Sequence, residues 1–185
     1  WTPKAVIYNV FTRLTTAFDH DGNNAIGSAQ IDMTVNEKGI RDCGTFLKTI
    51  AILPYIKSLG ANTLYLLPVN KIGMDNRAGN LGSPYATADL ESFDQRLADP
   101  LLGDMSVEDQ FAALVEAAHI MGIRVVTEFA MRTAALDCSK AKKHPDWFYW
   151  IYRENMANYG SPAFAESELE EIKKVPSGIG KYIAP

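Results

Sequence analysis

The sequence predicts an α/β fold in which parallel strands alternate with helices. Two apolar runs, at residues 62–68 and 124–129, flank a helix-like segment at 106–121. Strand, crossover helix and strand in this order form a βαβ unit, whose strands are parallel and whose connection is right-handed. A strand-like segment at 4–13 and a helix-like segment at 45–59 extend the order to β, α, β, α, β.

Different sequence features predict the first two strands. Residues 4–13 are rich in β-branched and aromatic side chains, which favour strands. The run at 62–68 is apolar on both faces, as in a parallel sheet that is covered on both sides. Between the first strand and the first helix, residues 14–44 are polar and rich in turn formers. We expect a loop there, with a short hairpin near residues 31–35.

Each predicted helix carries one apolar stripe, the pattern of a helix that buries a single face. The stripes are Phe46, Ile50, Leu53 and Ile56 in the first helix, and Phe111, Leu114, Val115, Ala118 and Met121 in the second. Gly60 suits the position just after a helix end, whereas Pro54 is expected to kink the first helix. Ser106 and Asp109 resemble a capping box at the start of the second helix.

The connection from residue 69 to residue 105 is long and contains several glycines. Connections between elements usually have about 4–6 residues. Long loops at the carboxyl ends of parallel strands are where α/β folds place ligand sites. We therefore interpret this loop as part of a binding site that the rest of the chain holds in place.

Composition indicates a globular domain with a sizeable core, since 47% of the 185 residues are apolar and 22% are charged. A net charge of −4 does not favour nucleic acid or an anionic membrane as a partner. No apolar run approaches the roughly 20 residues that span a bilayer. Two distant cysteines and three histidines make neither a disulfide framework nor a metal-site pattern. No metal and no cofactor is predicted.

The chain begins at Trp1 and not at a methionine, and its first residues show no leader pattern. We expect a piece of a longer protein or a processed one. Its localisation stays open. The cytoplasm is favoured because no signal peptide is visible and both cysteines are expected to be reduced.

Several segments carry a resemblance to a known family through their order and spacing. They are Leu53-Pro-Tyr-Ile-Lys-Ser-Leu-Gly60, the strand ending in Leu67-Pro68, Tyr85 with Asp89 four residues later, Gly103-Asp-Met-Ser-Val-Glu-Asp109 and Gly122-Ile-Arg-Val-Val-Thr-Glu-Phe129. Together they resemble the α-amylase superfamily of (β/α)8 barrel enzymes, which act on α-glucans. The resemblance covers roughly residues 5–150.

Within that superfamily the chain is most similar to the maltosyltransferases that use maltose 1-phosphate. The similar segments are Pro68-Val-Asn-Lys-Ile-Gly73, Arg77-Ala-Gly79, Gly82-Ser-Pro-Tyr-Ala86 and His144-Pro-Asp-Trp-Phe148. The resemblance implies the N-terminal part, about three βα units, of a (β/α)8 TIM barrel. Residues 1–133 would form this part of the catalytic barrel, and residues 134–185 an insertion-like region after the third strand.

The end of the third strand departs from the family pattern. Amylases carry Asp-x-x-x-Asn-His there, whereas this chain has Glu128, Arg132 and Thr133. The departure puts strict α-amylase activity in doubt, and also the calcium site that the asparagine often supports. In the family the nucleophile, the acid/base and a second aspartate follow the fourth, fifth and seventh strands. We expect the chain to end after the third strand, since a whole barrel needs about 250 residues.

These points lead to two hypotheses about function. The first is a fragment of an α-glucan-active enzyme, a glycoside hydrolase or a glycosyl or maltosyl transferase of carbohydrate metabolism. We assign no catalytic residue, and we expect the chain alone to be inactive. The alternative is a non-catalytic carbohydrate-binding or scaffold domain derived from that fold. The expected partner is an α-glucan or maltooligosaccharide, and open sheet edges also predict self-association.

Two residues of the long loop are the first site candidates. Tyr85 matches the family tyrosine that stacks on a sugar ring, since an aromatic face suits the apolar face of a pyranose. The alternative is an aromatic packed on the rim of the barrel. Asp89 is expected to support the loop by hydrogen bonds. Arg77 and Asn80 lie in the same loop and are further candidates for contact with sugar or phosphate.

The end of the third strand supplies the other candidates. Glu128 stands where barrel enzymes place working residues, although it could instead be paired with Arg132. Arg132 could bind a hydroxyl, carboxylate or phosphate, or it could be a surface arginine. The aromatic residues at 147–150 could form a sugar platform, but a core for the inserted region is the favoured interpretation.

Overall fold

The computed structural model describes residues 2–20, 22, 24, 35–79, 81–158, 165–167 and 170. The chain divides into two compact units, Trp1–Phe148 and Tyr149–Pro185. This division reflects packing within the chain. The family-based boundary between residues 133 and 134 stays a prediction.

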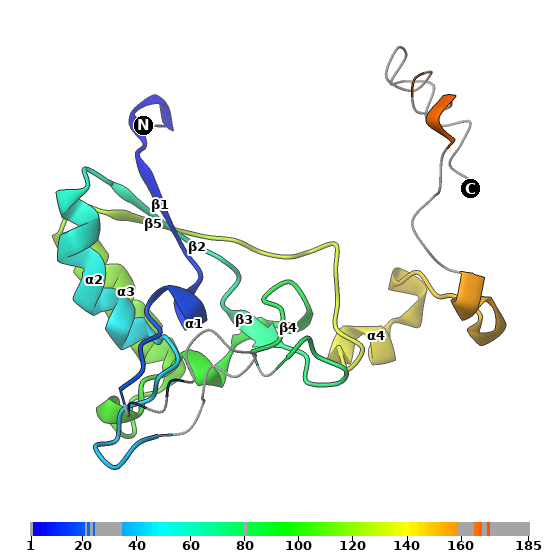
Figure 1. The fold of residues 1–185 in the computed structure, drawn as a ribbon, viewed down its shortest axis with the longest axis horizontal. Coiled ribbons are helices and arrows are strands. Elements are labelled where there is room, and N and C mark those ends of the chain that lie inside the picture. The colour runs from blue at the N-terminus through cyan, green and yellow to red at the C-terminus, as the bar shows by residue number, and fades with distance from the viewer. Residues whose placement is uncertain are drawn as a thin grey trace. The chain divides into compact units, whose positions relative to one another are not determined.

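The first unit is built on a three-stranded sheet in the order β1-β2-β5 (Figure 1). Its strands are β1 (Ile7–Val10), β2 (Thr63–Leu66) and β5 (Arg124–Thr127). Both pairings are parallel, with Leu64 opposite Tyr8 on one side and opposite Val125 on the other. The predicted parallel arrangement is confirmed.

The first strand is shorter than the sequence predicts. Residues Thr2–Lys4 form the 3-10 turn η1, and Thr12–Thr15 form a short helix, α1. The prediction of a strand through residue 13 is wrong because composition alone does not separate a strand end from a helical turn that follows it. The turn begins at Phe11, whose carbonyl accepts hydrogen bonds from the N–H groups of Leu14 and Thr15.

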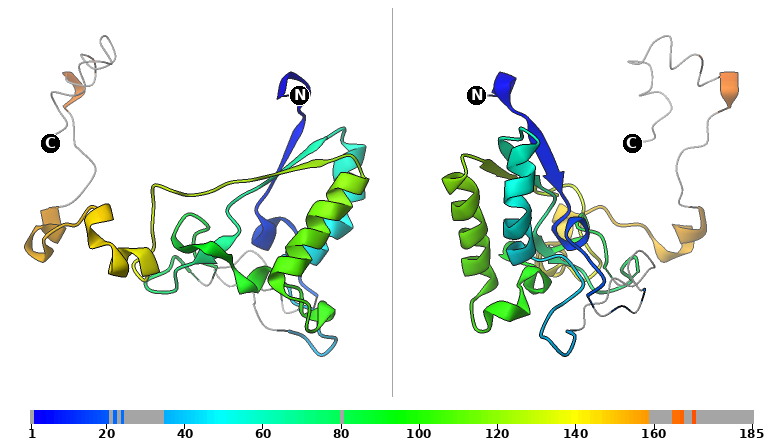
Figure 2. Two further views of the ribbon diagram at one scale, coloured as in Figure 1. Left: turned by 180° about the vertical axis from the view of Figure 1, so that it is seen from behind. Right: turned by 60° about the vertical axis from the view of Figure 1, so that its left-hand side comes forward.

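Two helices cover one face of this sheet, α2 (Phe46–Ser58) and α3 (Val107–Ile120). They lie side by side, as the two views in Figure 2 show. α2 continues through Pro54 and ends before Gly60, which adopts a φ of 82°. A positive φ is accessible to glycine without steric cost, so the residue suits a helix end.

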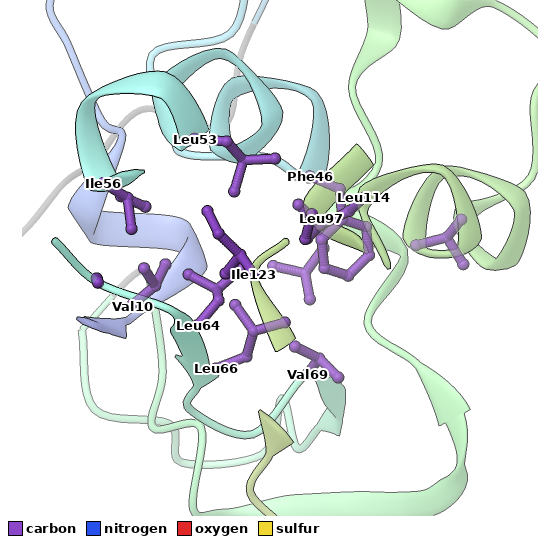
Figure 3. Packing of buried hydrophobic residues seen from close by; sticks show 13 residues of the cluster. Val10, Phe46, Leu53, Ile56, Leu64, Leu66, Val69, Leu97, Leu114 and Ile123 are labelled. Atoms are coloured by element: carbon purple, nitrogen blue, oxygen red, sulfur yellow. The ribbon is translucent and has the colours of Figure 1, made fainter. Parts of the chain in front are cut away.

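The hydrophobic core lies between the sheet and the two helices (Figure 3). Leu64 and Leu66 project from β2 toward Phe46, Leu53 and Leu114 of the helices, and all five are buried. Successive side chains of a strand point to opposite faces. Thr63 and Tyr65 of β2 therefore face away from the helices, toward the side on which the candidate site is formed.

The long connection after β2 contains a hairpin that the sequence did not indicate. Its strands β3 (Asn70–Ile72) and β4 (Thr87–Phe93) pair antiparallel with irregular register. Two 3-10 turns, η2 (Gln95–Leu97) and η3 (Pro100–Leu102), lead on to α3. A segment that was expected to be loop is therefore partly regular.

After β5 the first unit contains α4 (Ser139–Lys143) and the 3-10 turn η4 (Pro145–Trp147). In the second unit, Arg153–Asn158 form η5. The side chains of Trp147, Tyr149 and Trp150 are exposed. The favoured interpretation of this aromatic cluster as a core is therefore wrong.

The predicted hairpin near residues 31–35 cannot be followed in the described structure. Residues 31–34 lie outside the described residues, and Val35 forms an isolated antiparallel bridge with Arg41.

Candidate functional site

The candidate site is built at the carboxyl ends of β2 and β5. Glu128 follows directly after β5, and its N–H donates to the carbonyl of Leu66 at 2.9 Å. This bond continues the pairing of the two strands beyond their last regular residues. Side chains two apart in a strand share a face, so Glu128 and Val126 lie on the same face as Tyr65, which is opposite Val126 in the register.

The Glu128 carboxylate interacts with two phenols. The hydroxyl of Tyr85 donates to Glu128 Oε2 at 3.3 Å, and the Tyr65 phenol lies near enough for the same carboxylate to affect its pKa. The pKa of each phenol is raised above its ordinary value, chiefly by desolvation and further by the Glu128 carboxylate. Both phenols therefore remain protonated well above neutral pH.

Hydrogen bonds hold the backbone of Tyr85 in place, and its side chain is partly exposed. Its N–H donates to Ser83 Oγ at 3.2 Å, and its carbonyl accepts a hydrogen bond from the hydroxyl of Thr133. The side chain is 40% exposed. An aromatic ring that is fixed in place and open to solvent can stack on an apolar face of a ligand.

The two arginine candidates are placed differently. Arg132 is exposed, four residues after Glu128. Among the described residues, the ion pairs join Asp94 to Arg13 and Arg96, and Glu91 to Lys140. Glu128 thus has the Tyr85 phenol as a donor in place of the Arg132 partner considered from the sequence. Arg77 is half-buried, and its Nη1 lies 3.3 Å from Met74 Sδ. Asn80 lies outside the described residues.

Asp89 interacts with its own strand. Its carboxylate accepts hydrogen bonds from the N–H of Glu91 and the hydroxyl of Ser92, both at 2.9 Å. These two donors are the main reason that the pKa of Asp89 is lowered. In this position the side chain stabilises β4, the strand that follows Tyr85.

Sequence reasoning missed three residues that shape this region. Tyr65 could have been found from strand alternation, since it lies between two core leucines and points to the opposite face. Asp137 accepts a hydrogen bond from the N–H of Met74 at 2.9 Å and joins the segment after β5 to the end of β3. Arg13 is buried, donates to the carbonyl of Leu81, and lies 3.7 Å from Asp94.

The described residues contain no group of three or more His, Cys, Asp or Glu side chains suited to hold a metal ion. Cys43 and Cys138 are buried free thiols. In the same part of the chain, no helix is long and apolar enough to cross a bilayer.

No family model matches the sequence. Individual relatives do. A curated α-1,4-glucan:maltose-1-phosphate maltosyltransferase from Mycolicibacterium smegmatis is 30% identical over 178 residues, which are 91% of this chain and 22% of the relative. One from Cereibacter sphaeroides is 38% identical over 117 residues, 58% of this chain and 19% of the relative. The crystal structure of a Lactobacillus plantarum α-amylase matches with a TM-score of 0.58 and 30% identity, over 80% of this chain and 27% of that one.

The chain belongs to the α-amylase superfamily. It spans about one fifth of the length of these curated relatives. The three parallel strands, with α2 before β2 and α3 before β5, are the part of the TIM barrel that the sequence predicts.

This member of the α-amylase superfamily departs from the family pattern at Thr133, where the pattern has a histidine that contacts sugar. The Thr133 hydroxyl donates to the Tyr85 carbonyl. The residue at this position therefore supports the loop that carries Tyr85, and its hydroxyl proton is already engaged.

Proposed function

We propose that this chain forms part of the sugar-binding wall of an α-glucan-active enzyme. The observation that carries the proposal is the contact between Tyr85 and Glu128, which brings the long loop and the end of β5 together at 3.3 Å. The names of the relatives support the substrate class, since they specify an α-1,4-glucan and maltose 1-phosphate. Whether the enzyme hydrolyses or transfers is left open.

In this proposal the exposed ring of Tyr85 stacks on a pyranose, and Glu128 accepts a hydrogen bond from a sugar hydroxyl. An ionised carboxylate has about four acceptor positions, so the Tyr85 hydroxyl leaves capacity for a ligand. The hydrogen bond from Tyr85 also restricts the orientation of the carboxylate. Arg132, which is exposed and lies four residues after Glu128 in the sequence, supplies donors for a hydroxyl or a phosphate. Arg77 and Asn80 remain candidates from the loop.

The proposal assigns binding and positioning to these residues and no catalytic role. Retaining glycoside chemistry requires two carboxyl groups about 5–5.5 Å apart across the scissile bond. Glu128 accepts a hydrogen bond from Tyr85, and Asp89 accepts hydrogen bonds from a backbone N–H and a hydroxyl of β4. We therefore expect the 185-residue chain to bind α-glucans without turning them over.

Titration of the chain with maltotriose, followed by calorimetry, tests the proposal. Tyr85→Ala should weaken binding by about tenfold, because stacking on an aromatic ring contributes roughly 1 kcal/mol or more. Tyr55→Ala is the matched control, because Tyr55 is 57% exposed on α2, far in sequence from the site. Equal affinities for the two variants would contradict the role of Tyr85.

A turnover assay separates binding from catalysis. The chain is incubated with maltooligosaccharides and with maltose 1-phosphate, and released sugar and phosphate are measured. We expect neither product. Measurable release would show that catalytic groups lie among residues to which we assign none.

One observation favours a second candidate, a non-catalytic carbohydrate-binding or scaffold domain. Thr133 bonds to the Tyr85 backbone where the family pattern has a sugar-contacting histidine. The reading frame beyond codon 185 discriminates between the two. Later strands that carry an aspartate nucleophile and a glutamate acid/base favour the enzyme, whereas a stop codon favours the binding domain.

A further inference from the structure

A cavity of about 250 Å³ lies in the first unit, between β4 and the segment that follows β5. Thr87 and Asp89 line it from β4, Met131 and Thr133 from the segment after β5, and Lys140 and Trp147 from α4 and η4. Sites for drug-sized ligands usually have about 300–1,000 Å³. A smaller space of this kind suits a single ring.

Trp147 gives the cavity an aromatic surface of fixed orientation. Its ring stacks on the imidazole of His144, with centroids 4.1 Å apart and planes inclined by 9°. The Trp147 side chain is nevertheless 66% exposed. One face of the indole is therefore covered by His144, while most of the side chain is open to solvent. An exposed aromatic ring suits the apolar face of a sugar ring.

Polar groups lie beside this aromatic surface. Asp89 offers a carboxylate, and Lys140 Nζ pairs with Glu91 Oε1 at 2.6 Å at the edge of the cavity. Thr87 is 3% exposed, and within the described part of the chain its hydroxyl has no hydrogen-bond partner. Buried hydroxyls nearly always form a hydrogen bond. The Thr87 hydroxyl could form one with a ligand by rotating toward the cavity.

The cavity and the candidate site share a residue. Thr133 lines the cavity and also donates its hydroxyl to the carbonyl of Tyr85. The residue that supports the Tyr85 backbone is thus part of the cavity wall. A ligand with several linked rings could contact Tyr85 with one ring and Trp147 with another.

We propose that this cavity is a second pyranose subsite of the same α-glucan-binding region, with Trp147 as its stacking platform and Asp89 and Lys140 as its polar rim. The inference rests on the proposed function and adds a specific place for a further sugar unit. An aromatic face together with hydroxyl-binding groups is the combination that a pyranose requires.

The test uses Trp147 as its own reporter in the full chain. Trp1→Phe and Trp150→Phe together leave Trp147 as the single tryptophan of the chain, which has three. We expect its fluorescence to change on titration with maltotriose and to become less accessible to a soluble quencher. Cellotriose, which has the same rings in a different linkage, should have a much smaller effect.

Affinity measurements on matched variants complete the test. Trp147→Ala should weaken maltotriose binding by about tenfold, and Trp147→Phe should restore part of the loss because an aromatic face is kept. Trp150→Ala is the control, since Trp150 is similarly exposed at 67% but does not line the cavity.

The outcomes distinguish the two proposals. If the unsubstituted chain does not bind maltotriose, both fail. If Tyr85→Ala weakens binding and Trp147→Ala does not, only the second subsite is overturned. If Trp147 is already shielded from the quencher and maltotriose leaves its emission unchanged, protein covers the cavity and the subsite is likewise overturned.

Discussion

At the scale of single residues, the clearest feature is the hydrogen bond from the Tyr85 phenol to the Glu128 carboxylate. Sequence could place Glu128 at the end of a parallel strand and Tyr85 in the loop after its neighbour. Because the carboxyl ends of parallel strands lie at one edge of the sheet, the sequence predicted that Glu128 and Tyr85 lie in the same region. Strand alternation could have placed Tyr65 on the face opposite the core, but its position opposite Val126 depends on the register of the two strands. The sequence could not decide between Arg132 and tyrosine partners for Glu128, because that choice depends on side-chain direction.

Glu128→Gln should lower the pKa of Tyr65 and Tyr85 toward the ordinary value while leaving the effect of desolvation. A raised pKa in the folded state means that the phenols stabilise the fold below their ordinary pKa of 10.0. That contribution is lost as pH rises through the folded-state pKa. Tyrosinate absorbance against pH measures the change. Glu108→Gln, on the exposed side of α3, is the control, and superimposable curves for Glu128→Gln and the parent chain would contradict the contact.

Gly73 is a position where space is limiting. A Cβ added there would lie 2.1 Å from Ala135 Cβ and 2.4 Å from Asp137 Oδ1. Gly73→Ala should therefore destabilise the fold by about 1–3 kcal/mol, the usual effect of overpacking. Ala135→Gly should recover part of this loss in the double variant, because it removes one of the two clashing atoms. Urea denaturation measures both, and strictly additive effects would show that the two segments do not approach closely.

At the scale of elements, the sequence predicted what depends on local pattern. The apolar stripes identified α2 and α3, and the central parts of β2 and β5 followed from apolar runs. The hairpin of β3 and β4 could not be predicted, because β3 has three residues and the pairing is irregular. Directly after β4, Asp94 pairs with its neighbour Arg96 and with Arg13 of α1, which is distant in sequence.

The two helix caps should differ in their effect on stability. Ser106 caps α3 at an exposed position by accepting from the N–H of Asp109 at 3.0 Å. Thr45 caps α2, and its buried hydroxyl also donates to Asp99 Oδ2 at 2.6 Å. Ser106→Ala should cost about 1 kcal/mol. Thr45→Val should cost about 3 kcal/mol, because a buried carboxylate also loses a donor. Equal losses in chemical denaturation would contradict this difference.

At the scale of the molecule, the sheet has two open edges in the part of the chain that the structure describes. β1 and β5 each pair on one side, with β2. The family resemblance accounts for this, because a barrel strand requires two neighbours and the chain spans about one fifth of its curated relatives. Which surfaces meet further strands depends on residues beyond the described sheet, so local pattern could not specify it. Unpaired edges favour association with other strands.

We therefore expect the chain to self-associate as its concentration rises, with β1 as one contact. Ile7 in this strand is 59% exposed, and Ile7→Lys should shift the population toward monomer, because a charge on an edge strand opposes pairing between chains. Ile120→Lys is the matched control, since Ile120 is 79% exposed at the end of α3 and belongs to no strand. Sedimentation velocity over a range of concentrations measures both. A parent chain that stays monomeric throughout would show that this edge is protected, and an equal effect of the two lysines would assign association to exposed apolar surface in general.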